Sequence, residues 1–194
     1  MHPILNQNLY FVKEHLGLFK AANNFDIFEP KSQQQILKCR EEVTGMAKFL
    51  RWTDFKRITP FHIEIQTPKG EKVLSVRRGW TFWRSRVEVF DHRDQLVGTF
   101  RQRLLSLGGK FEVLSPTGEL LCMLKGKWTG WNFQFIRDTQ VFAEVTKKWN
   151  GIGREMFTTA DNYMLSIGPS VPSGHPLRIL ILAAVMSIDM VLKE

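Results

Sequence analysis

Hydrophobic and polar residues alternate along much of this chain in short runs that are separated by tight turns. In Phe61–Gln66, apolar residues alternate with His62, Glu64 and Gln66, and this period of two predicts a strand with one buried and one solvated face. The pattern of strand, turn and returning strand occurs five times, with turns at Pro30, Gly70, Asp94, Gly118 and Thr139. The last four turn centres are 24, 24 and 21 residues apart, which indicates a repeat of β-hairpins.

The last apolar run, Leu177–Leu192, is hydrophobic on every side of a 3.6-residue helix and must therefore be enclosed. Its 16 residues span about 24 Å as a helix, which is short of the ~30 Å hydrocarbon core of a bilayer. Arg178 and Asp189 shorten the apolar run further, and Pro176 suits the first helical position. We therefore predict a helix buried in a protein core, in preference to a membrane span.

Strands and helix together predict a mainly β fold. Leu9–Leu18 supplies a further strand, whereas residues 43–59 fit either an irregular strand or one helical turn. A meander of about 12 short strands tends to close into an antiparallel barrel, because closure removes exposed edges. Such a barrel is too wide to be filled by its own side chains. We predict a closed barrel of about 12 strands around a central hydrophobic helix at 177–192, in a single domain over residues 1–194.

The composition is that of a globular chain with excess positive charge, since 43% of its residues are hydrophobic and its formal net charge is +8. Such a surface attracts polyanions without choosing among nucleic acid and anionic lipid. Met1–Asn8 has neither the basic nor the apolar region of a secretory signal, so we expect a cytoplasmic protein, peripheral at the membrane. Cys39 and Cys122 lie in apolar, alternating stretches and are expected to be reduced, packed thiols.

Basic residues follow the hairpins at the places where the returning strands end. Because each hairpin brings the chain back, we expect the turns at one rim of the barrel and these strand ends at the other. The basic residues are Lys38, Arg40, Arg77, Arg78, Arg101, Arg103, Lys125, Lys127, Lys147 and Lys148, with Arg84, Arg86 and Arg154 just beyond. Trp80, Trp83, Trp128, Trp131 and Trp149 accompany them, and this pairing is typical of proteins at lipid headgroups. The other interpretation is that the charges discourage edge pairing and the tryptophans cap the lumen.

No pattern of enzyme chemistry occurs. The five histidines are scattered, no GxSxG or GxxxxGK[ST] sequence is present, and Gly151-Ile152-Gly153 lacks the rest of a dinucleotide fingerprint. We therefore predict a protein that is not an enzyme and has no cofactor.

Two C-terminal segments carry a family resemblance. VTKKWNGIGREMFTTADNYML (Val145–Leu165) and AVMSIDMVLKE (Ala184–Glu194) resemble the C-terminal third of the phospholipid scramblase family. NNFDIF (Asn23–Phe28) and TPFHIEIQTPKGE (Thr59–Glu71) are similar to strands of that family's barrel. The family is related in fold to tubby C-terminal domains and to plant LURP-one-related proteins. The resemblance implies a 12-stranded barrel around a central hydrophobic helix, the architecture that the patterning predicts independently.

The resemblance also locates a degraded calcium segment. Family members have an acidic run, and the corresponding stretch here is Thr159-Ala160-Asp161-Asn162-Tyr163, with threonine in place of the first carboxylate. Calcium sites use several oxygen ligands and usually more than one carboxylate. Asp161 and Asn162 would form a weak metal site, and a turn into the last strand is the preferred interpretation. The cysteine cluster that takes palmitate in the family is absent from this sequence.

These observations predict a non-enzymatic, scramblase-like protein that binds anionic phospholipid or phosphoinositide headgroups at the membrane surface. The predicted lipid-binding residues are Arg77, Arg78, Arg101, Arg103, Lys125, Lys127, Lys147, Lys148 and Arg154. The alternative is a soluble interaction or regulatory barrel whose partner is a protein or, less favoured because no recognised motif is present, a nucleic acid.

Overall fold

Twelve strands, one short 3-10 helix and one long helix make up the structure, a computed structural model that describes residues 1–15, 24–42, 59–80, 86–102, 110–127, 132–147 and 162–192. In chain order the elements are η1 (Pro3–Asn6), β1 (Leu9–His15), β2 (Asn24–Phe28), β3 (Gln35–Glu42), β4 (Phe61–Gln66), β5 (Lys72–Arg78), β6 (Arg86–Asp91), β7 (Leu96–Gln102), β8 (Phe111–Leu114), β9 (Leu120–Lys127), β10 (Asn132–Arg137), β11 (Gln140–Thr146), β12 (Asn162–Ile167) and α2 (Leu177–Leu192).

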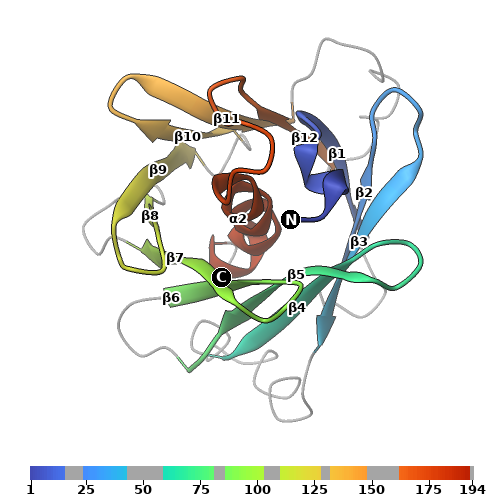
Figure 1. Cartoon of the computed structure of the whole chain (residues 1–194), viewed down its shortest axis with the longest axis horizontal. Coiled ribbons are helices and arrows are strands. Elements are labelled where there is room, and N and C mark those ends of the chain that lie inside the picture. The colour runs from blue at the N-terminus through green and yellow to red at the C-terminus, as the bar shows by residue number, and fades with distance from the viewer. Residues whose placement is uncertain are drawn as a thin grey trace.

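The strands form a closed antiparallel barrel in which each strand pairs with its neighbours in the sequence, and β1 pairs with β12 to complete the circle (Figure 1). The predicted fold class is thus confirmed, down to the number of strands. Gly70 and Gly118 lie in the β4–β5 and β8–β9 turns with φ angles of +91° and +86°. Glycine adopts this left-handed conformation without steric cost, which is why these turns could be predicted from the sequence.

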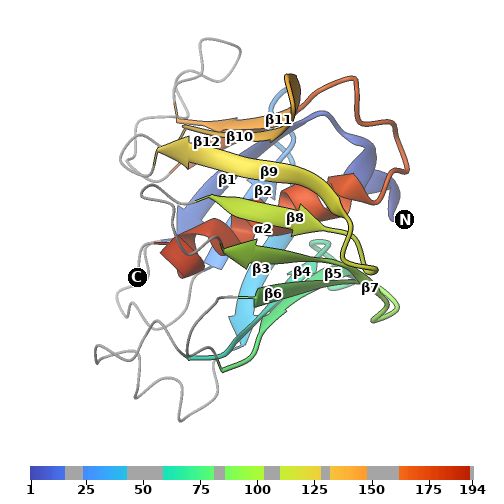
Figure 2. The same cartoon turned by 90° about the vertical axis from the view of Figure 1, so that its left-hand side faces the viewer.

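Consecutive antiparallel strands give the barrel two different ends. The tight turns of the hairpins β2–β3, β4–β5, β6–β7, β8–β9 and β10–β11 lie at one end, which we call the turn end. The strand ends that lead into the other connections lie at the opposite end, which we call the exit end. In Figure 2 the N-terminus and the turn end are on the right, and α2 runs from there through the barrel toward the exit end.

Alternating side chains of the strands line the lumen. In β4 the buried residues Phe61, Ile63 and Ile65 face inward, while the intervening polar residues are half-buried on the outside. The same alternation buries Cys39 and Cys122, which are free thiols as predicted. Burial raises the pKa of the Cys122 thiol to about 12, so this cysteine stays protonated and unreactive at neutral pH.

Helix α2 fills the lumen. Every side chain from Leu177 to Ser187 is buried, as expected for a helix that is apolar on all sides and enclosed by a barrel. His175 caps the helix, because its Nδ1 accepts a hydrogen bond from the backbone N–H of Leu177 at 3.2 Å. The central hydrophobic helix of the predicted fold is confirmed, and its burial is described from Leu177 to Ser187.

Arg178, in the first turn of α2, ties the helix to the N-terminal segment. This side chain is 3% exposed. Its guanidinium donates six hydrogen bonds of 2.7–3.4 Å to the carbonyl oxygens of Leu5, Gln7, Val171 and Pro172 and to Oδ1 of Asn8. Arg178, which interrupts the apolar pattern in the sequence, is therefore a structural clamp that joins η1 and the two residues before β1 to the segment before α2.

Gly98 in β7 allows close approach between the wall and the central helix. A Cβ atom at this position would lie 2.3 Å from the carbonyl oxygen of Leu114 and 3.0 Å from the δ-methyl groups of Leu180. We expect Gly98→Ala to lower the free energy of unfolding by about 1–3 kcal/mol through overpacking. At roughly 2–4 °C per kcal/mol, calorimetry should detect a lower Tm.

Gly79→Ala is the matched control for this substitution, because a Cβ atom there meets nothing within 4 Å. The control should change the Tm by little. Equal Tm values for the two variants would contradict the packing argument.

Two sequence predictions reach into segments outside the described residues. The structure describes the first predicted strand from Leu9 to His15, as β1, and residues 16–18 of that prediction lie outside the described ranges. The open question about residues 43–59 lies almost wholly outside the described residues, since only Thr59 of that range is described.

Candidate functional site

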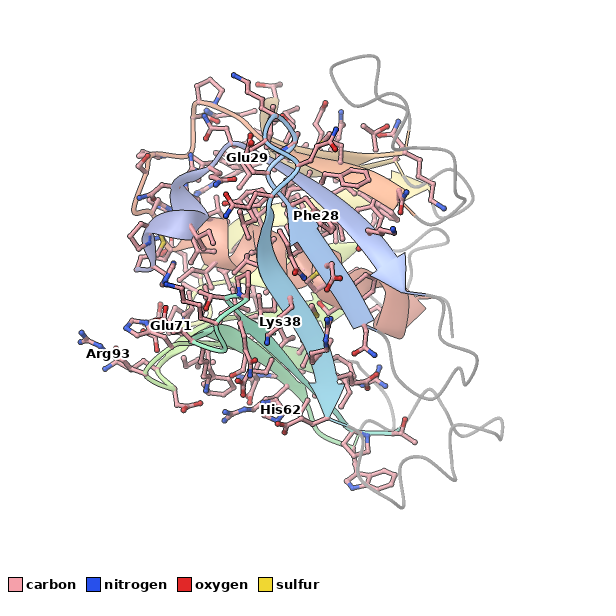
Figure 3. All side chains as sticks on the ribbon, turned by 90° about the vertical axis from the view of Figure 1, so that its right-hand side faces the viewer. Phe28, Glu29, Lys38, His62, Glu71 and Arg93 are labelled. Carbon is pink, nitrogen blue, oxygen red and sulfur yellow. The ribbon has the colours of Figure 1, made fainter. Side chains whose placement is uncertain are left out.

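The predicted basic residues that the structure describes fall on, or directly after, strands that have one end at the exit end, but several of their side chains are engaged on the barrel wall. Lys38 on the outer face of β3 (Figure 3) reaches the carbonyl oxygen of Pro68, in the β4–β5 turn, at 3.5 Å. Arg40 donates to Oδ1 of Asp26 at 2.9 Å and to the carbonyl oxygens of Phe25 and Cys39. These two cations therefore stabilise the wall beside them.

Arg77 is drawn toward the turn end. Its guanidinium lies 4.6 Å from the centre of the Phe90 ring and pairs with Asp94 in the β6–β7 turn. Lys72 pairs with the same carboxylate at 2.7 Å. The hydrogen bond from Lys72, followed by that from Arg77, lowers the pKa of Asp94 below its usual value, so the carboxylate remains charged at neutral pH. The Arg77 head group thus points along the outer wall, away from the exit end.

Arg78 has the opposite orientation to Arg77 because successive residues of a strand face opposite sides. It is 3% exposed and faces the lumen, where its Nη2 donates to the carbonyl oxygen of Thr59 at 2.8 Å. Its guanidinium also stacks 4.7 Å from the centre of the Phe61 ring. Glu41 of β3 is also buried, and because it lies two residues after inward-facing Cys39 its side chain faces the lumen as well. Arg78 is therefore part of the inner lining, and its guanidinium is not presented to solvent.

Arg101 and Arg86 are cross-strand neighbours on the outside of the wall. Arg101 forms an ion pair with Glu112 of the next strand, at 2.6 Å. Arg86, whose side chain is 64% exposed, has only a loose contact of 3.6 Å with Glu88. Exposed pairs of this kind contribute little, so the Arg86 guanidinium is available to a ligand.

Lys125 is a predicted residue whose side chain is exposed and not engaged by the described part of the chain. It is exposed on the outer face of β9, near the exit end, and none of the described side chains pairs with it. Lys13 of β1 is also exposed and has no such partner, although our sequence analysis did not single it out. The alternation of the strand could have identified this residue in the sequence. Tyr10 and Val12 are buried and face inward, so Lys13 faces outward near the end of its strand.

The remaining predicted residues are placed only in part. Lys127 is the last residue of β9, and Lys147 directly follows β11. Arg103, Lys148 and Arg154 lie outside the described residues, as does Asp161. In the sequence these four positions fall between strands whose ends meet at the exit end.

Of the predicted calcium segment, the structure describes Asn162 and Tyr163 but not Asp161. Asn162 is 5% exposed at the start of β12, and its cross-strand partner is Lys13, whose positive charge opposes a divalent ion. Across the described ranges, no His, Cys, Asp and Glu side chains gather in a group that could hold a metal ion.

Trp80 adds an exposed aromatic side chain to the exit end. It follows β5 by two residues and is 50% exposed, the highest value among the large hydrophobic side chains that the structure reports as exposed. Each of the other five tryptophans falls, by sequence, in a connection between strands at the same end and lies outside the described residues. The hairpin turns contain none.

Two surface cavities lined by described residues lie at the opposite end of the barrel. One of about 400 Å³ is lined by Met1, His2, Asp91, His92 and Arg93. A neighbouring one of about 360 Å³ adds residues of the β6–β7 hairpin and of the start of α2. Oδ1 of Asp91 accepts hydrogen bonds from the backbone N–H groups of Arg93 and Gln95, which assigns this carboxylate a role in the turn.

A comparison with models of protein families identifies the family of this chain. The family model described as Scramblase matches residues 5–194, nearly the whole chain. This chain belongs to the Scramblase family. The match confirms the sequence resemblance and links this Scramblase-family barrel to phospholipids in general. No curated protein and no solved structure matches the chain.

A helix that crosses a bilayer must be long and apolar enough to span its hydrocarbon core. In the part of the chain that the structure describes, none of the helices has the length and apolar character needed to cross a membrane.

Proposed function

We propose that the exit end of this Scramblase-family barrel binds the surface of bilayers that contain anionic phospholipids, and that it does so without enzymatic chemistry. Exposed Trp80 at the same end as the unpaired cations Lys13 and Lys125 is the observation that carries this proposal. Tryptophan rings favour the headgroup region of a bilayer, and lysines beside them are attracted to its negative charge. Family membership supports the lipid as the partner, since scramblases act on phospholipids and are generally not enzymes.

Binding to lipid vesicles gives a direct test of this proposal. Sedimentation with phosphatidylcholine vesicles, with and without phosphatidylserine, should show binding only to the anionic vesicles. Binding should weaken as salt rises, because the Debye length is only about 10 Å at 0.1 M. We expect the double variant Lys13→Glu/Lys125→Glu to bind at least about tenfold more weakly, since each cation near the surface contributes about 1 kcal/mol.

The matched control carries the same change in net charge at the turn end. Lys31 and Lys69 are exposed residues of the β2–β3 and β4–β5 turns, so Lys31→Glu/Lys69→Glu should bind nearly as well as the wild type. Trp80→Ala should weaken binding at every salt concentration. Absence of binding by the wild type, or equal losses in both double variants, would contradict the proposal.

A further inference from the structure

Within the described ranges, the cations of the exit end that have accessible, weakly engaged side chains are separated from one another around the barrel. Lys13 lies on β1, Lys125 on β9 and Arg86 on β6. In the circular strand order, four steps separate β1 from β9, three separate β9 from β6, and five separate β6 from β1. At about 4.8 Å per strand, neighbouring members of this set are roughly 14–24 Å apart along the wall. That spacing exceeds the width of one phospholipid headgroup.

As far as the structure describes them, the arginines that are close together in the sequence do not form a joint anion site. Recognition of a single polyvalent phosphate group requires several donors that converge on it, and paired arginines are well suited to this. Arg77 is instead committed to Asp94, Arg78 faces the lumen with Thr59, and Arg101 pairs with Glu112. Among the residues with described side chains, the cations that stay available are thus ones that lie apart on the barrel wall.

From this distribution we infer that the exit end responds to the charge density of a bilayer, and that it engages several singly charged phospholipids at once through Lys13, Arg86 and Lys125. It does not select one phosphoinositide headgroup. This inference rests on the proposed function and specifies its ligand: a surface of monoanionic lipids such as phosphatidylserine, each cation meeting a different lipid molecule.

Vesicles matched in surface charge test this inference. One set contains phosphatidylserine and the other a smaller fraction of phosphatidylinositol bisphosphate, adjusted to equal zeta potential. The wild type should bind both sets equally, with a sigmoidal dependence on the fraction of phosphatidylserine. An excess of a soluble inositol phosphate should not displace it.

Single neutralisations should act equally and independently. Lys13→Gln, Arg86→Gln and Lys125→Gln should each weaken binding about fivefold, the equivalent of about 1 kcal/mol per cation, and their combinations should multiply. Lys69→Gln at the turn end is the control and should have little effect.

The outcomes separate this inference from the proposed function. Much stronger binding to the phosphoinositide vesicles, displacement by the soluble headgroup, or abolition of binding by one neutralisation alone would overturn the charge-density inference and leave membrane binding in place. Failure of the wild type to bind any anionic vesicle would overturn both.

Discussion

A chain that ends after Ser173, and so lacks α2, is expected to lose cooperative unfolding altogether. The deletion removes Leu180, Ile181, Leu182, Val185 and Met186, all at most 1% exposed within the lumen. At about 1.5–3 kcal/mol for each fully buried side chain, these five residues alone match the ~5–15 kcal/mol by which a folded protein is stable. The emptied lumen would also expose the inward-facing side chains of the barrel wall to water.

Calorimetry and dye binding measure this result. The truncated chain should show no sharp heat-absorption peak, little near-UV circular dichroism and strong binding of a hydrophobic dye. The control is Leu182→Ala in the full-length chain. It should retain a cooperative transition that is weakened by about 2–5 kcal/mol, because only one cavity is created. Cooperative folding of the truncated chain would refute a core role for α2.

Arg178→Met should produce the second large loss of stability. The substitution keeps an apolar stem of similar length but removes six hydrogen bonds from a charged donor. It leaves the carbonyl oxygens of Leu5, Gln7 and Val171 without this donor in a buried place. A buried acceptor that loses its donor costs about 1–3 kcal/mol, so over these carbonyl oxygens the loss should reach about 3–5 kcal/mol, and chemical denaturation should show a shift of that size.

Arg178→Lys separates charge from geometry. The lysine ammonium has three N–H donors and cannot make all the hydrogen bonds that the planar guanidinium makes. Most of the loss of stability seen in Arg178→Met should therefore persist in Arg178→Lys. Arg93→Met, at an exposed position of the same barrel end, should stay within about 0.5 kcal/mol of the wild type. Similar stabilities for Arg178→Met and Arg93→Met would contradict the clamp.

The barrel could be predicted because its determinants are local. The alternation in Phe61–Gln66 depends only on neighbouring residues, and the turns at Gly70 and Gly118 use a backbone conformation that favours glycine. The central helix was predictable for a global reason: an all-round apolar helix and a wide barrel each need the other. The role of Arg178 was not predictable, since half of its hydrogen bonds go to residues at the chain start, more than 160 positions away.

The candidate site was predicted less well, and two arginines show why. Arg78 is in phase with the buried residues Leu74 and Val76, so alternation could have assigned it to the lumen. The position of the Arg77 side chain depends on its ion pair with Asp94 in the next hairpin. Whether these two residues meet is set by the register of the strands, including the bulge in the β6–β7 pair, and the register was not predicted. Sequence proximity to a strand end therefore overstates how many cations a barrel rim presents.

The direction of α2 decides where an attached reporter would sit. The helix starts at the turn end, beside η1, and its last turn lies toward the exit end (Figure 2). A fluorescent protein fused ahead of Met1 would project away from the bilayer that we propose as partner. The same fusion placed after α2 would stand between the barrel and the lipid. Cellular imaging with the two fusions would accordingly report different distributions for one protein. Of the two fusions, the amino-terminal one leaves the exit end open.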